Sequence, residues 1–206
     1  GGLAISANSS LQARNLSCCY DSHCILREVT FEVKPGEVAA IVGRSGSGKT
    51  TLAYCLSGII PHRIHASVSG EVRVNGINVL SSTFAEVVKN VNVVLEDYES
   101  QIFGLTVEED IVFGLENLKL PNLEIRERLD LKDRQRALIS ELSGGLKQRL
   151  AIASVVALKP KFLILDNPTS NLDWPSVKGL SKAIAELKRH GCGIVLFLRK
   201  IKGLEN

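Results

Sequence analysis

A glycine-rich segment with one lysine and two threonines carries the clearest chemistry in the sequence. It reads GRSGSGKTT and fits the phosphate-loop pattern G-x-x-x-x-G-K-[ST] at every fixed position. Glycines let successive backbone N–H groups turn towards phosphate oxygens. Lys49 offers an ammonium to the β and γ phosphates and Thr50 a hydroxyl to magnesium, while a helix expected from Lys49 to about Ser57 points its positive end at the same anion. The candidate nucleotide-binding residues are Gly43, Arg44, Ser45, Gly46, Ser47, Gly48, Lys49, Thr50 and Thr51.

A chance glycine-rich turn is the alternative to a phosphate loop. An apolar strand over 38–42 and a helix after the loop provide the context that the motif requires, and both favour phosphate binding. Phosphate binding by itself leaves kinases, GTPases and motor ATPases open.

A second candidate site residue, Asp166, follows the apolar run 162–165. A carboxylate at the end of a buried strand is costly unless it meets a cation. We therefore predict that Asp166 is a magnesium ligand together with Thr50, the alternative being an ordinary acid at a strand end.

The elements that must position these residues alternate between strands and helices. A helix over 175–190 is predicted because Val177, Leu180, Ile184 and Leu187 recur at spacings of three and four, with Gly191 as a stop signal. Alternation of this kind predicts an α/β fold around a mostly parallel sheet. The predicted strands are 29–33, 38–42, 71–74, 91–95, 162–165 and 193–198.

The middle of the chain is expected to be a helical insert, over about 100–145. Thr106 and Glu109 have the spacing of a capping box, which predicts a helix from Val107 towards Leu118. The charged stretch 124–136 also favours helix. We expect one domain over 1–206, with residues 1–10 loose.

Composition narrows the classes of protein. The 206 residues are 45% hydrophobic and 23% charged, as in an ordinary globular domain, and the net charge of +3 comes from interspersed signs, which gives nucleic-acid binding no support. Apolar runs are too short to span a bilayer, and the first residues do not resemble a secretory signal, so a cytoplasmic location is expected. The five cysteines form no CxxC pair, and we expect all of them to be reduced.

Two further segments resemble those of one family. LSGGLKQR, at 142–149, resembles the LSGGQ signature of ABC ATPases, and FLILDNPTSNLD, at 162–173, resembles their Walker B strand and D-loop. The order and spacing of these elements over most of the chain resemble an ABC nucleotide-binding domain. The resemblance implies a P-loop NTPase core with an antiparallel β subdomain and a short helical signature subdomain.

The resemblance also assigns roles. The signature residues Leu142, Ser143, Gly144 and Gly145 would serve the ATP that is held by an opposite subunit. Tyr20 stands where the family places an aromatic residue that stacks on adenine, although a core tyrosine remains the alternative. The implied cofactors are ATP and Mg²⁺.

Two passages resemble the ATPases of energy-coupling factor transporters, which take up vitamins and cobalt or nickel ions. They are GIIPHRIHASVSGEVRVNGINV from Gly58 and ESQIFGLTVEEDIVFGLENLKLP from Glu99. The resemblance implies a transmembrane coupling protein as partner, received near 101–109, and a place on the inner face of the membrane.

Several positions depart from the family pattern. Asn167 replaces the glutamate that polarises water, and an amide cannot act as a general base. Arg199 replaces the switch histidine; it can bind phosphate but cannot shuttle protons. Glu96 replaces the Q-loop glutamine and could still contact magnesium, and Leu146 replaces the last signature glutamine.

The segment 129–141 is also shorter than usual, and the chain stops soon after Lys200, before the family's last helices. A trimmed piece or one half of a tandem protein would account for this.

These departures predict a degenerate site that binds Mg-ATP and hydrolyses it slowly, because Lys49, Thr50 and Asp166 remain. A non-identical second ABC domain, or the other half of a tandem chain, would then carry the competent base. One alternative is an active homodimeric transport ATPase, for which Asp173 is the nearest substitute base. The other is a non-transport ABC interaction module.

Overall fold

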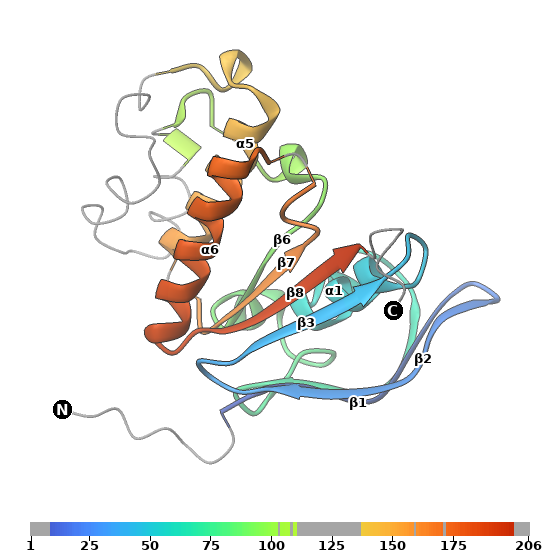
Figure 1. The fold of residues 1–206 in the computed structure, drawn as a ribbon. Coiled ribbons are helices and arrows are strands. Elements are labelled where there is room, and N and C mark those ends of the chain that lie inside the picture. The colour runs from blue at the N-terminus through green and yellow to red at the C-terminus, as the bar shows by residue number, and fades with distance from the viewer. Residues whose placement is uncertain are drawn as a thin grey trace, which may run out of the picture.

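The computed structural model describes residues 9–102, 104–107, 109–110, 137–158, 160–170 and 172–199, and contains two four-stranded sheets. The first is parallel, with strand order β3-β8-β7-β6, and runs through the middle of Figure 1. Phe162, Ile164 and Ile194 in its centre are fully buried, as expected for strands that are covered on both faces. Its strands are β3 (Val38–Gly43), β6 (Val91–Val94), β7 (Phe162–Asp166) and β8 (Gly193–Arg199).

The second sheet is antiparallel, with order β2-β1-β4-β5. Sequence patterning missed β1 because its register shifts around Asn15, which has a φ of 47° and interrupts the alternation of buried and exposed residues. The same sheet contains the predicted strands 29–33 and 71–74 within longer ones. Its strands are β1 (Leu11–Tyr20), β2 (His23–Val33), β4 (Ser67–Val74) and β5 (Ile77–Asn78).

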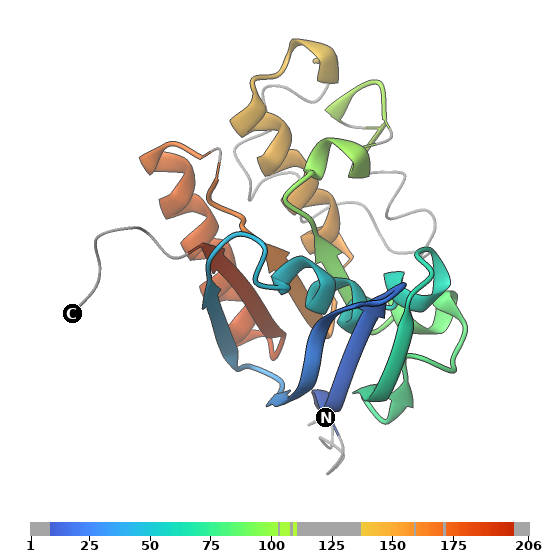
Figure 2. The ribbon, with the colours of Figure 1, turned by 90° about the vertical axis from the view of Figure 1, so that its right-hand side faces the viewer.

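Helices cover both faces of the parallel sheet. Helix α1 (Lys49–Ser57) lies between the two sheets, and α6 (Trp174–Arg189) lies on the opposite face of the parallel one (Figures 1 and 2). Both helices confirm the sequence predictions to within a residue or so at each end. Shorter helices α2 (Ile59–His62) and α3 (Phe84–Val88) follow α1, and α5 (Gly144–Ala157) precedes β7.

Two apolar clusters hold the layers together. One fills the space between the sheets around α1, with Leu56, Phe162 and Phe197 fully buried. The other joins the far face of the parallel sheet to α5 and α6 through Leu165, Ile152 and Leu180. Ile184 and Leu187 pack against this second cluster, which confirms the apolar face predicted for the helix over 175–190.

The capping box predicted at Thr106 is present. The backbone N–H of Glu109 donates to Thr106 Oγ1 at 3.3 Å, and Glu109 Oε2 accepts from the N–H of Thr106 at 3.2 Å. The remainder of the predicted helix towards Leu118, and the charged stretch 124–136, lie outside the described residues.

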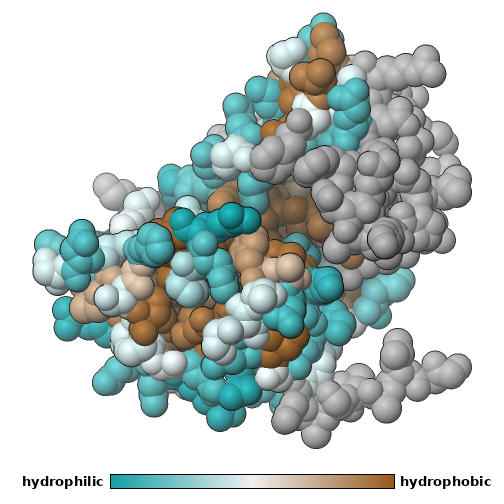
Figure 3. Space-filling view, turned by 180° about the vertical axis from the view of Figure 1, so that it is seen from behind, coloured by the Kyte–Doolittle hydropathy of each residue, from teal (hydrophilic) through white to brown (hydrophobic). Residues whose placement is uncertain are grey.

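Within the described ranges, no helix is both long enough and apolar enough to cross a membrane. Seen from behind, the molecule has apolar surface gathered in a hollow near its centre (Figure 3). A cavity of about 310 Å³ lies between α1, α3, β6 and α5, and its lining includes Val91, Val93, Gln101, Asp110 and Val155.

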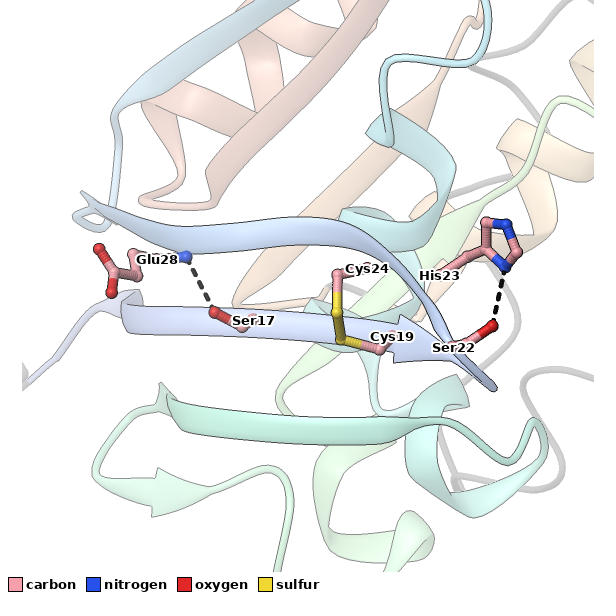
Figure 4. Close-up of a disulfide and its surroundings, with 6 residues drawn as sticks. All are labelled: Ser17, Cys19, Ser22, His23, Cys24 and Glu28. Atoms are coloured by element: carbon pink, nitrogen blue, oxygen red, sulfur yellow. Dashed lines mark hydrogen bonds between the residues drawn. A yellow bond between two sulfur atoms is a disulfide. The ribbon is translucent and has the colours of Figure 1, made fainter.

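The expectation that all five cysteines are reduced is wrong for two of them. Cys19 and Cys24 form a disulfide across the β1–β2 hairpin (Figure 4). A two-residue turn, Asp21 and Ser22, places these cysteines directly opposite each other, a relation that a search for CxxC pairs does not detect. Cys18, Cys55 and Cys192 are free and buried.

Counting reactive thiols tests this arrangement. A chromogenic thiol reagent should find almost none in the native chain, three after unfolding without reductant, and five after unfolding with reductant. Burial raises the pKa of Cys192 to about 12, so its reactive thiolate is scarce in the folded state. A fast-reacting thiol at the exposed Cys24 in the native chain would contradict the disulfide.

Candidate nucleotide site

The carboxyl ends of the parallel strands bring the predicted site residues together. Gly43 at the end of β3 is paired with Arg199 at the end of β8, and Asp166 at the end of β7 is paired with Phe197. Glu96 lies just beyond β6, whose Val94 pairs with Leu165. Ligands of open α/β sheets bind at this edge, where the loops after the strands converge.

A pocket of about 320 Å³ opens at that edge, between the phosphate loop and the β1–β2 hairpin. Eleven of its twelve lining residues were predicted from the sequence, and Ile25 was missed. Gly43, Arg44 and Ser47 do not line it. The lining residues are Tyr20, Ile25, Ser45, Gly46, Gly48, Lys49, Thr50, Thr51, Glu96, Asp166, Asn167 and Arg199.

The phosphate loop depends on glycine at two positions. Gly46 and Gly48 have φ values of 77° and 88°, which residues other than glycine rarely adopt. A Cβ at Gly48 would also lie 3.0 Å from Ile25 Cγ2 and 3.1 Å from Leu26 Cδ2. Strand β2 therefore packs directly against the loop and supports the start of α1.

Lys49 is turned onto the loop itself. Its Nζ donates to the carbonyl oxygens of Gly43 at 2.9 Å and Arg44 at 2.7 Å, and to Ser47 Oγ at 3.3 Å. These three acceptors match the three protons of an ammonium. The same flexible ammonium would exchange neutral oxygens for charged phosphate oxygens, which make stronger hydrogen bonds.

Thr50 and Asp166 form the candidate magnesium site. Thr50 Oγ1 donates to Asp166 Oδ2 at 2.7 Å, and Asp166 is 2% exposed. Burial raises the pKa of the Asp166 carboxyl above its usual value, while the bond from Thr50 opposes the rise. A hydroxyl and a carboxylate are oxygen ligands of the kind that Mg²⁺ takes, and its charge would offset the cost of burial. The donor set therefore fits the metal.

Three of the four positions at which the sequence departs from the resembled pattern meet at Glu96, which contacts both Asn167 and Arg199. Glu96 Oε1 accepts a hydrogen bond from Asn167 Nδ2 at 3.2 Å and forms an ion pair with Arg199 Nη2. Asn167 has a φ of 49°, a conformation that asparagine tolerates better than most residues, and its N–H donates to Phe197 O at 2.8 Å. Glu96 thus links the ends of β7 and β8.

The hairpin forms the remaining wall of the pocket. Tyr20 and Ile25 both line it, immediately beside the disulfide cysteines, and Ile25 is 42% exposed. Tyr20 also packs against the main core, so its position is compatible both with stacking on adenine and with an ordinary core tyrosine. Ile25 could have been found by noting that a short hairpin brings the residues flanking its turn together.

The signature residues lie outside this pocket, as the N-terminus of α5. Ser143 caps the helix, its Oγ accepting from the N–H of Leu146 at 3.4 Å, while Leu142 is buried. A Cβ at Gly144 would lie 3.3 Å from Tyr98 Oη, and Lys147 pairs with Glu99 at 3.3 Å. The helix start thus rests on the segment that follows Glu96.

A sequence profile of the family described as ABC transporter matches residues 26–170, which is more than half of the chain. The chain belongs to the ABC transporter family. The match includes the phosphate loop, the signature and Asp166.

Named relatives agree with this ABC assignment. One from Saccharolobus solfataricus, named as an ABC transporter ATP-binding protein, is 39% identical over 84% of this chain and 34% of its own. Another from Pyrococcus abyssi is 44% identical over 72% of this chain and 55% of its own. The chain therefore spans about a third to a half of the length of these relatives.

Two solved structures share the ABC ATPase fold. The ATP-binding subunit of an ABC transporter has a TM-score of 0.78 at 27% identity, covering 93% of this chain and 80% of its own. CbiO1 of Clostridium perfringens, part of the ABC transporter complex CbiONQ, has a TM-score of 0.75 at 33% identity. The match covers 94% of this chain and 80% of the CbiO1 chain. The chain is an ATP-binding domain of this family, whose members bind ATP with Mg²⁺.

Proposed function

We propose that this single nucleotide-binding domain is the ATP-binding subunit, or half, of an importer of the energy-coupling factor type, and that its own site holds Mg-ATP while hydrolysing it slowly. The observation that carries the proposal is the pocket at the carboxyl edge of the sheet. It combines Lys49, Thr50 and Asp166 with an amide, Asn167, at the position of the general base.

The binding part of the site is complete in its chemistry. The loop N–H groups, Lys49 and the N-terminus of α1 offer positive charge to the phosphates. Thr50 and Asp166 would hold Mg²⁺, with Glu96 as a further oxygen within the same pocket. Tyr20 would stack on adenine. The metal would neutralise phosphate charge when bound.

The hydrolytic part is incomplete. Asn167 can orient water through hydrogen bonds but cannot take its proton, and Arg199 stays protonated at neutral pH. Phosphoryl transfer relies on positioning and charge stabilisation, so the site retains the means to hold ATP while losing those that activate water.

A second ABC domain is the proposed partner. The residues Ser143, Gly144 and Gly145 do not line this chain's pocket and stand at a capped helix start, where an anion is favoured. They would complete the ATP site of a non-identical domain, or of the other half of a tandem protein, that retains its catalytic glutamate.

A transmembrane coupling protein is the other proposed partner. The cavity between α1, β6 and α5 includes Gln101, from the segment 101–109 expected near the coupling helices, and Asp110, the residue that follows this segment. The likeness to CbiO1, part of the complex CbiONQ, supports this partner and a place on the cytoplasmic face of the membrane. No nucleic-acid partner is proposed.

ATPase assays of the chain alone and mixed with its partner domain test the proposal. The chain alone should hydrolyse ATP slowly, and the mixture should hydrolyse it faster. Ser143→Arg should abolish this increase, because an arginine at position 143 would block the signature. A high rate from the chain alone, abolished by Lys49→Ala, would support the active homodimer instead. Copurification with nucleic acid rather than with a membrane protein would favour the non-transport module.

A further inference from the structure

The ion pair between Glu96 and Arg199 lies inside the nucleotide pocket rather than on a remote surface. Both side chains line the pocket together with Lys49, Thr50 and Asp166. They come from the ends of β6 and β8, on either side of the strand that carries Asp166. A γ-phosphate bound by Lys49 would enter the same space.

Glu96 occupies its partners in the way a phosphate would. Its Oε1 accepts from the amide of Asn167 and from the guanidinium of Arg199, two donors at the ends of adjacent strands. A phosphate oxygen would accept from the same donors, because guanidinium binds phosphate and carboxylate in the same geometry. The carboxylate therefore occupies two donors that a terminal phosphate could also bind.

The exchange favours phosphate for two reasons. The Arg199 and Glu96 side chains are 53% and 39% exposed, and exposed ion pairs are weak because water and salt screen them. A terminal phosphate carries more negative charge than a carboxylate and offers three acceptor oxygens. ADP lacks that group, so in the ADP state Arg199 would keep its partner Glu96.

We propose that Glu96 sets how strongly this site prefers a nucleoside triphosphate over a diphosphate, by competing with the γ-phosphate for Arg199. The inference rests on the proposed function, since it requires nucleotide in this pocket. It assigns Glu96 a role towards Arg199 in addition to any role towards magnesium.

Binding measurements on the unchanged chain and four variants test the inference. The unchanged chain, Glu96→Gln, Arg199→Gln, Arg199→Lys and the double variant of Glu96→Gln with Arg199→Gln are titrated with ATP and with ADP by competition against a fluorescent ATP analogue. Each titration is run with Mg²⁺ and with a chelator, because the chelator removes any contribution of Glu96 as a metal ligand. The quantity compared is the ratio of the two affinities.

Glu96→Gln should raise the preference for ATP about threefold, since only a weak pair is removed. Arg199→Gln should lower that preference about tenfold, since a charged hydrogen bond to phosphate is lost. The double variant should match Arg199→Gln, because releasing Arg199 has no effect when Arg199 is absent. Arg199→Lys should recover part of the preference.

Matched controls come from a second Arg–Glu pair, on β4. Glu71 and Arg73 are bonded at 2.6 Å and lie outside the pocket, so Glu71→Gln and Arg73→Gln should leave both affinities unchanged. Thermal unfolding of every variant checks that the fold is retained.

Two results would overturn the inference alone. One is an equal gain in ATP preference from Glu96→Gln with and without Arg199. That result would show that the Glu96 carboxylate repels the γ-phosphate directly and does not act through Arg199. The other is an unchanged ATP preference in Arg199→Gln. The proposed function would fail if the unchanged chain bound neither ATP nor ADP, or if Lys49→Ala bound both as well as the unchanged chain does. The inference about Glu96 would then fail too, because it requires nucleotide in this pocket.

Discussion

The triple variant Glu96→Gln, Asn167→Glu and Arg199→His should hydrolyse ATP at least about a hundredfold faster than the unchanged chain, because a positioned general base contributes two to four orders of magnitude. Asn167→Glu alone should increase the hydrolysis rate only slightly. The Asn167 amide lies 3.2 Å from Glu96 Oε1, so a glutamate there would face a second carboxylate. Like charges in one site raise a carboxyl pKa, and a protonated acid is not a base.

The conformation of residue 167 adds a cost to this variant. Its φ of 49° is left-handed, a conformation that costs most residues about 1–2 kcal/mol and asparagine less, so the substitution should lower the free energy of unfolding by part of that amount. Thermal unfolding should show this loss without unfolding the chain at assay temperature. ATPase rates are best measured over a range of chain concentrations, because under the proposed function a second copy of the chain would have to supply the signature in this assay. Equal rates for Asn167→Glu and the triple variant would show that the contact with Glu96 is irrelevant.

Lys49→Ala should weaken Mg-ATP binding about a hundredfold. An ammonium that contacts two phosphates contributes at least two charge-assisted hydrogen bonds of about 1.5 kcal/mol each, and about 3 kcal/mol corresponds to two orders of magnitude. The substitution also removes the ammonium that holds the loop carbonyls of Gly43 and Arg44.

Isothermal titration with Mg-ATP measures this loss. Lys34→Ala is a matched control, because Lys34 is exposed and precedes β3, whereas the phosphate loop follows that strand. Affinity within a few-fold of the unchanged chain in Lys49→Ala would show that nucleotide binds elsewhere.

Much of the site could be predicted from the sequence because its parts are local. The strand before the phosphate loop, the loop itself and α1 are contiguous, so one motif places the nine residues 43–51 at once. Asp166 was found for a similar reason, since an acid that ends a buried apolar strand is visible without any partner.

The features that were missed depend on pairing between distant or cross-strand residues. Glu96 lies 71 positions from Asn167 and 103 from Arg199, and only the order of the parallel strands brings the three together. The sequence flagged each as a separate departure from the family. The disulfide and Ile25 were missed because both follow from the register of one hairpin, whose first strand is interrupted at Asn15.

In the proposed function, this chain's own site holds ATP and hydrolyses it slowly. The most direct measurement follows the bound nucleotide after the chain is loaded with Mg²⁺ and γ-labelled ATP and freed of excess, with the triple variant as a faster reference. An ordinary site working at about 10 turnovers per second would convert its ATP within a second. We expect the nucleotide on the unchanged chain to remain ATP for minutes. Rapid conversion to ADP that Lys49→Ala prevents would show that the site hydrolyses ATP at an ordinary rate and would contradict the proposed function.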